Sequence, residues 1–489
     1  MPQDVLQHIA FLVATDSVTE LPRHLSSLLL TNTQVYHSLS VPNCPSLYAS
    51  IFRATFDREG KLHQSLTDSA LAAELLRRYR FLWRIRRHNA SSSPTPEDLL
   101  AALRMVLENN GRNDAHLAAA NFPDFMLSFV RECLAHQAED LYQRSARCTI
   151  TSLALWLLCL TITHKDIVSI PEAMRAELRK SLCFPIIYPT SAINFVPSSS
   201  CDVSSGIGEL EPSSPAIILA FALNEVVPLL IPPHIPQTRA IAIESQRDGP
   251  TVEDFQACSN LKTPLFTETR RIAVSSSASD SILKALNEIE LSRVLYSSYG
   301  LSAPSRRGHG GSLAGLWEGN FMLSSLTCEP KPTEQLPPAV LMNFNCLKPM
   351  QCAISEYLCF SPHLPLPEDH PLDLLAPAIR SGKLGYQRVS PGGSTSTQRN
   401  PLEALDVVIL GEDHEQAWNG FRFAGRMRSD GVIVMRREPK DTDDREGLGS
   451  WVFEGRLRYG AAFVGKIRSG GTTVRGIFSL QKTDPTWQR

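Results

Sequence analysis

The sequence predicts an α+β multidomain protein, with an all-α amino-terminal part followed by a carboxyl-terminal antiparallel β-barrel. A change in periodicity along the chain carries this prediction. Up to about residue 190 the apolar residues recur every three to four positions, as on one face of a helix, whereas from residue 313 they alternate, as on a strand. The 489 residues are enough for about three domains.

The first module, over residues 1–42, is predicted to hold three short amphipathic helices. Apolar residues of the first follow the helical repeat at Val5, Leu6, Ile9, Leu12 and Val13. A second helix is expected from Pro22, and Thr31 or Asn32 would cap a third. A module of roughly 40 residues rarely buries enough apolar surface to fold alone. We therefore expect one of its faces to pack on a partner or on the rest of the chain.

Residues 43–190 are predicted to form an α-helical body of stacked, armadillo-like helix pairs. Thr95–Asp98 combines a cap, a first-turn proline and acidic residues, and Asn110–Gly111 ends the helix that follows. The arginines of 77–87 alternate with aromatic residues, a combination that also binds nucleic acid. An apolar stripe in the same helix and a net charge of −2 favour a solvated arginine face, so no nucleic-acid partner is expected.

No membrane segment or secretory signal is predicted. The stretch Cys148–Thr163 is apolar but has only 16 residues, fewer than the roughly 20 that cross a bilayer, so it is predicted to be a buried helix. The amino terminus has no basic segment followed by an apolar one. The 11 cysteines form no C-x-x-C pair and no metal-binding spacing, which is typical of reduced thiols in a cytoplasmic or nuclear protein.

Residues 191–311 are predicted to be a partly helical connector. Its loops are rich in proline and serine, as in 197–200 and 211–215. Helices are expected over 215–231 and 280–296, and the glycine-rich segment Ser305–Gly311 reads as a linker.

Residues 312–489 repeat one strand pattern. The sequence aromatic-x-Gly-basic-aliphatic-Arg occurs at Phe423–Arg428, Phe453–Arg458 and Phe463–Arg468, with a looser copy at Trp317–Met322. Alternation places the aromatic, glycine and aliphatic residues on one face and the basic residues on the other. A glycine at the same place in each strand suits a sharply coiled sheet. We therefore expect a closed, lipocalin-like or avidin-like barrel with the phenylalanines inside.

The amino-terminal module resembles an F-box. Met1–Leu12 follows that family's opening pattern, L-P-x-E-[VIL]-L-x-x-I, with Met1 in place of Leu and Asp4 in place of Glu, and Val35–Leu39 supplies the closing aromatic and aliphatic residues. The segment Thr15–Glu20 is extra. The resemblance implies docking on the Skp-type adaptor of a cullin-RING ubiquitin ligase. The residues expected to bind the adaptor are Pro2, Val5, Leu6, Ile9, Leu12, Leu25, Leu28 and Leu29.

A second resemblance covers most of the chain. Four segments are similar to a large group of fungal F-box-like proteins: Asn109–Asn113, Cys346–Cys352, Gly411–Trp418 and Phe453–Gly455. It implies a non-enzymatic substrate receptor of an SCF-class ubiquitin ligase, whose carboxyl-terminal domain recruits an unknown protein client.

The basic face of the barrel strands is the expected client-binding surface. Its residues are Arg426, Arg428, Arg456, Arg458, Lys466 and Arg468. If the second and third copies of the pattern pair as a hairpin, four of these charges meet on one patch, which suits an acidic or phosphorylated segment. The alternative is a solvated exterior neutralised by Glu454 and by the acidic run Asp441–Asp444.

Two other function classes stay open: a ligand- or peptide-binding β-barrel without a ubiquitin-ligase role, and an enzyme of unrecognised type. His309–Ser312 is similar to an esterase oxyanion loop, but no G-x-S-x-G elbow follows it. Asp413–Glu415 offers at most one base or metal ligand. Because no nucleophile has a credible base, we expect no catalytic residue, no metal site and no cofactor.

Overall fold

The computed structural model describes residues 2–17, 19–20, 22–57, 66–87, 94–136, 144–187, 211–227, 229–246, 250–268, 313–324, 347–361, 372–389, 404–412, 421–428, 430–440, 450–469 and 475–483. These residues divide into two compact units. Helices α1 to α9 belong to the first unit, and helices α10 to α14, α19 and all the strands belong to the second. Helices α10 to α12, which the predicted domain boundaries separate from the barrel, thus group with it.

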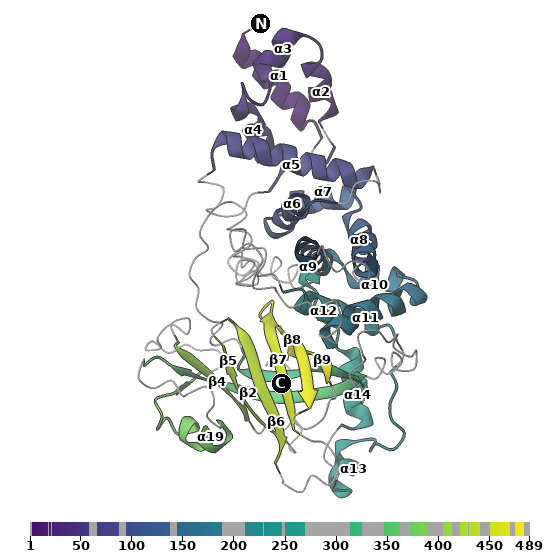
Figure 1. Cartoon of the computed structure of the whole chain (residues 1–489), viewed down its shortest axis with the longest axis vertical. Helices are drawn as coiled ribbons and strands as arrows, with labels where there is room; N and C mark the ends of the chain where they lie inside the picture. Colours follow the sequence, from purple (N-terminus) through teal and green to yellow (C-terminus); the bar gives the residue numbers. More distant parts are fainter. Residues whose placement is uncertain are drawn as a thin grey trace. The chain divides into compact units, whose positions relative to one another are not determined.

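The first unit is helical throughout its described part, as predicted. Its helices are α1 (Gln3–Thr15), α2 (Arg23–Leu29), α3 (Thr33–Leu39), α4 (Pro45–Thr55), α5 (Asp68–Arg86), α6 (Pro96–Leu107), α7 (Arg112–Ala119), α8 (Phe122–His136) and α9 (Arg144–Thr161). Helices α1, α2 and α3 pack on one another, and α1 also packs on α4 (Figure 1). The three expected helices of the first module are therefore present.

Side-chain caps fix where several of these helices begin. The Asn32 side chain accepts a hydrogen bond from the Gln34 amide at 2.8 Å and starts α3. Thr95 and Asp98 form a reciprocal capping box at the start of α6, with Pro96 in its first turn. Such caps satisfy amide groups that the first turn leaves without a helical partner. Both starts follow the sequence prediction.

Helix α5 departs from the prediction at one arginine. Leu71, Leu75 and Leu82 form the expected buried stripe. Arg78, however, is also fully buried instead of lying on a solvated face. Its guanidinium donates to Glu74 at 3.1 Å and to Glu108, at the end of α6, at 2.8 Å. Arg78 can be buried on this helix face because the Glu74 and Glu108 carboxylates compensate its charge.

Helix α9 contains the predicted buried apolar stretch. Its residues from Leu153 to Leu160 are all buried, and it packs against α6 and α8. Among the described helices, none has the length and apolar character needed to cross a membrane.

The helices of the second unit are α10 (His164–Ser169), α11 (Glu172–Ile187), α12 (Ser213–Asn224), α13 (Arg239–Glu244), α14 (Val252–Asn260) and α19 (Leu372–Arg380). Every residue of α12 is buried, as expected for this stretch. It ends at Asn224, earlier than predicted, because the prolines further on cannot continue it. The helix predicted over 280–296 lies outside the described residues.

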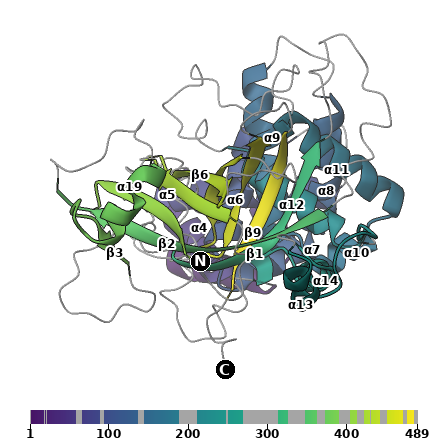
Figure 2. The same ribbon diagram turned by 90° about the horizontal axis from the view of Figure 1, so that it is seen from below.

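The strands of the second unit are β1 (Gly315–Ser324), β2 (Leu347–Cys359), β3 (Gln387–Arg388), β4 (Asp406–Glu412), β5 (Phe421–Met427), β6 (Val432–Pro439), β7 (Trp451–Arg458), β8 (Ala462–Ser469) and β9 (Arg475–Lys482). They pair antiparallel in the order β1-β9-β8-β7-β6-β5-β4-β2-β3. Because β1 pairs with both β9 and β2, eight strands close into a barrel, and β3 is a short addition to β2 (Figure 2). The predicted closed antiparallel barrel is confirmed.

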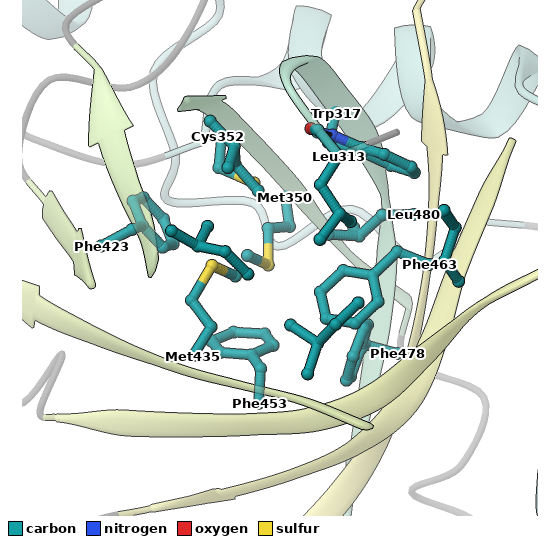
Figure 3. Close-up of a cluster of buried hydrophobic side chains, with 14 of the residues drawn as sticks. Leu313, Trp317, Met350, Cys352, Phe423, Met435, Phe453, Phe463, Phe478 and Leu480 are labelled. Carbon is teal, nitrogen blue, oxygen red and sulfur yellow. Dashed lines mark hydrogen bonds between the residues drawn. The ribbon is translucent and has the colours of Figure 1, made fainter. Parts of the chain in front are cut away.

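Apolar side chains from all eight barrel strands fill the interior (Figure 3). Phe423, Phe453 and Phe463 point inward, as the alternation predicts. The rings of Phe453 and Phe463 meet Phe478 edge to face, with centroids 5.2 and 4.8 Å away. Trp317 is fully buried beside them and donates to the Leu313 carbonyl at 2.7 Å.

The glycines of the repeated pattern allow close approach of neighbouring strands. Gly455 of β7 faces Gly465 of β8 in register. A Cβ on Gly455 would lie 2.3 Å from the Val464 carbonyl oxygen, and one on Gly465 would lie 2.2 Å from the Glu454 carbonyl oxygen. Since real Cβ atoms do not approach so closely, only glycine fits at these positions.

Helices α11, α12 and α19 cover parts of the outer barrel surface. Helix α12 packs against β8 and β9, and α11 packs against β9. On another side, Ile379 of α19 packs with Tyr357, Val408 and Leu410 from the outer faces of β2 and β4. The barrel is therefore a layered unit with apolar packing on both faces of some strands.

Candidate functional site

Helix α1 carries two apolar faces. Ala10 and Ala14 are buried against the rest of the helical unit. Val5, Ile9 and Leu12 have the spacing i, i+4, i+7 and lie on another face, where they are 43%, 36% and 53% exposed. A helix with an inward apolar face does not need a second one for its own packing. We call Val5, Ile9 and Leu12 the α1 stripe.

Other exposed apolar side chains belong to the same three-helix module. Leu30, directly after α2, is 83% exposed, and Tyr36 of α3 is 51% exposed. Leu30 is not among the adaptor-binding residues predicted from the sequence. The run Leu28–Leu30 was a signal for it, because the short α2 cannot turn three successive leucines inward.

The predicted adaptor-binding residues separate into three groups. Pro2 and the α1 stripe are exposed, whereas Leu6, Leu28 and Leu29 are half-buried within the module. Leu25 is only 4% exposed and belongs to the core of the module. Direct contact by Leu25 with a partner is therefore not supported, since the side chain already packs inside.

The module is fastened to the body by α4 and α5. Helix α4 packs against both α1 and α5. Arg86, near the end of α5, donates a hydrogen bond to the carbonyl of Thr19 in the connection between α1 and α2. The α1 stripe is thus held on a packed support and not on a free arm.

Charged side chains hold α5 and α6 together beneath this support. Glu74 accepts from Arg78 at 3.1 Å, from Arg104 at 2.7 Å and from Arg77 at 2.6 Å. Burial opposes ionisation of Glu74, but the charges of Arg78, Arg104 and Arg77 outweigh it and lower the pKa of the carboxyl. The carboxylate is therefore the stable form in this network.

A neutral histidine lies beside the network. The ring of His116 stacks on Phe56 at 4.4 Å, and its Nε2 lies 3.1 Å from the Thr55 carbonyl oxygen. Burial lowers the pKa of His116 to about 4, an effect that the Thr55 carbonyl only partly offsets. This histidine is a structural group that stays uncharged at neutral pH.

The basic residues of the barrel share its outer face but form two separate groups. Arg428 and Arg456 both contact Asp430 in the β5–β6 turn, the first through its carboxylate at 3.4 Å and the second through its carbonyl at 2.5 Å. Arg426 lies 3.4 Å from the Asp406 carboxylate and is largely covered. These three arginines have partners within the chain.

Arg458 is covered by another part of the second unit. It is 3% exposed and donates to the hydroxyl of Ser214 in α12 at 2.8 Å. Its expected role on an open client-binding patch is therefore corrected: the residue joins the helix layer to the barrel.

The second basic group lies along β8 and β9. The predicted β7–β8 hairpin is present, and its register places Lys466 opposite Glu454 and Arg468 opposite Val452. On its other side Arg468 lies directly opposite Arg475 of β9. The sequence analysis does not include Arg475, because only the β8–β9 register shows that it lies opposite Arg468. We call Lys466, Arg468 and Arg475 the β8–β9 basic face.

The weaker chemical motifs receive no structural account. His309–Ser312, Asp413–Glu415 and the acidic run Asp441–Asp444 lie outside the described residues. In the part of the chain that the structure describes, no three His, Cys, Asp or Glu side chains gather as a metal site.

Comparison with known proteins adds no relative. No protein family matches the chain. No curated protein and no solved structure matches it either. Functional inference therefore depends on the geometry of these surfaces.

Proposed function

We propose that this protein is a non-enzymatic substrate receptor of an SCF-class ubiquitin ligase. The amino-terminal module would bind the Skp-type adaptor, and the barrel unit would recruit a protein client for ubiquitin-dependent degradation, in the cytoplasm or nucleus. The observation that carries the proposal is the α1 stripe: an exposed apolar row on a small helical module that is packed onto its own body.

The α1 stripe suits a helical or grooved protein partner. Its three side chains recur at helical spacing, which is how amphipathic helices present anchors to an apolar groove. Burying a large apolar side chain contributes roughly 1.5 to 3 kcal/mol. Because α1 is already ordered on its support, binding through this stripe would not add the entropy cost of ordering the helix.

For the client, the β8–β9 basic face supports the proposal best. Arg468 is exposed, and Lys466 lies two residues before it on the same outer face of β8. An acidic or phosphorylated client segment would pair with these two cations through charge-assisted hydrogen bonds.

The test measures binding of the purified chain to a Skp-type adaptor. Substituting Ile9→Asp together with Leu12→Asp places two charges on the exposed stripe without entering the core. We expect adaptor affinity to fall at least about a hundredfold, from the loss of two apolar anchors. Leu374→Asp, at a 77% exposed apolar position on α19, is the matched control and should bind as the original chain does.

Unchanged adaptor affinity in the double variant would overturn the proposal, as would failure of the original chain to bind any Skp-type adaptor. Circular dichroism of the variant checks that the helices persist. Proximity labelling with the same variants then separates clients that depend on the adaptor from those held by the barrel alone.

A further inference from the structure

One arginine inside the barrel has no counterion among the described residues. Arg437 of β6 follows Ile433 and Met435 on the inward-facing positions of its strand and is 5% exposed. Its guanidinium stacks on the ring of Phe421, with the guanidinium carbon 4.2 Å from the ring centroid. Its Nε has no hydrogen-bond partner. Among the described residues, no carboxylate lies within ion-pair distance of it.

The thiol that interacts electrostatically with Arg437 does not neutralise this charge. The thiol of Cys352, from β2, lies in the same interior, but burial raises the pKa of that thiol to about 12. The thiol is therefore protonated and neutral at physiological pH. Burial also lowers the pKa of Arg437, to about 10, which still leaves the guanidinium charged at pH 7.

Other buried arginines of the chain are placed differently. Arg104 donates to Glu74 at 2.7 Å, and Arg458 donates to the Ser214 hydroxyl at 2.8 Å. A buried charge without such partners costs more than a single cation–π contact returns. Because no anion among the described residues meets Arg437, we look for its partner outside the chain.

Arg437 lies near one end of the barrel. It is two residues from Pro439, the last residue of β6, and it pairs in register with Trp451, the first residue of β7. The middle of the interior is filled by Phe453, Phe463 and Phe478 (Figure 3). A ligand bound by Arg437 would therefore enter the barrel at this end, and the filled interior would keep it from going deeper.

We propose that this end of the barrel binds an apolar organic acid, whose carboxylate pairs with Arg437. A planar guanidinium matches a planar carboxylate through two parallel hydrogen bonds. The single cation suits a monoanion, and the buried rings of Phe421 and Phe423 with the side chain of Met435 offer apolar contact to the rest of the molecule. The low exposure of Arg437 selects a slender acidic group over a folded protein surface. This site is independent of the adaptor-binding function proposed above.

The test uses 4-phenylbutyrate and its uncharged amide, 4-phenylbutanamide, as probes of the full-length chain. Calorimetric titration should show binding of the acid and at least tenfold weaker binding of the amide. Arg437→Gln keeps a polar side chain but removes the charge, and should weaken binding of the acid about tenfold to a hundredfold while leaving the amide unchanged. Arg436→Gln changes the neighbouring, exposed arginine and is the matched control, expected to bind the acid normally.

Three results would overturn the proposal: no binding of the acid, equal binding of acid and amide, or undiminished binding of the acid by Arg437→Gln. Thermal unfolding of the original chain with each probe tests the charge preference without any variant. Stabilisation by the acid and not by the amide is expected there, and equal shifts for both would count against the site.

Discussion

Arg78 in the helical unit and Arg437 in the barrel are both buried, and both stack on phenylalanine rings. The guanidinium of Arg78 lies 4.9 Å from the Phe52 ring centroid, and that of Arg437 lies 4.2 Å from the Phe421 centroid. The difference is in the carboxylates. Arg78 donates to both Glu74 and Glu108, whereas no carboxylate among the described residues meets Arg437.

This contrast separates a structural charge from a candidate binding charge. The carboxylates around Arg78 tie α5 to α6, so its burial is explained by the fold of the helical unit. The burial of Arg437 is not explained in that way. A buried cation thus indicates a ligand only where no carboxylate of the protein compensates its charge.

The largest expected effect comes from breaking the satisfied network. Glu74→Gln removes the carboxylate that Arg78, Arg104 and Arg77 share, and leaves buried positive charge without compensation. We expect the free energy of unfolding of the helical unit to fall by about 3 to 5 kcal/mol, measured by urea denaturation. Glu97→Gln, at an exposed position on α6, should cost less than about 1 kcal/mol. Equal effects of the two substitutions would contradict the structural role.

A smaller effect is expected from pH, through His116. Its pKa in the folded chain, about 4, is below the ordinary 6.5, so the unfolded chain takes up the proton first. Stability is therefore complete above pH 6.5 and is lost as the pH falls toward 4. The expected loss is about 2 kcal/mol between pH 6.5 and pH 5, from roughly 1.4 kcal/mol for each pH unit.

Urea denaturation at the two pH values measures this loss. His116→Gln cannot take up a proton at this position, so that variant should be less stable but should lose the histidine contribution to the slope. A slope that the substitution does not change would show that His116 is not the titrating group.

The smallest effect on stability is expected at the barrel. Arg437→Met replaces an uncompensated cation by an apolar side chain of similar length. Without ligand, the free energy of unfolding should change by less than about 1 kcal/mol or should rise, as seen when buried charges are exchanged for packed apolar groups. Thermal unfolding of the purified chain checks this. A loss as large as that of Glu74→Gln would mean that Arg437 has a structural partner.

The regular parts of the fold could be predicted from local sequence. The Thr95 cap, the helices of the first module and the alternation in the strands each depend on residues a few positions apart. The glycines of the repeated pattern also predicted the close strand approach of a coiled sheet. Barrel closure followed because the same pattern recurred in several strands.

What could not be predicted depends on contacts distant in sequence. The local pattern predicts a solvated face for Arg78 because its partner Glu108 is 30 residues away. The local pattern likewise predicts an exposed Arg458 because its partner Ser214 is 244 residues away. The sequence places Arg437 on the inward positions of Ile433 and Met435, but the structure is needed to show that no carboxylate of the described residues joins it there.

The cover that α12 provides has a practical consequence for isolating the barrel. A fragment cut at residue 312 would contain all the strands but would lack α11 and α12, which pack on β8 and β9. Val464 and Ile477, on the outer face of these strands, would then be exposed to solvent. Such a fragment should be poorly soluble and should self-associate during expression. A useful fragment would have to include α10 to α12, so the natural cutting point lies near residue 163, where the second compact unit begins.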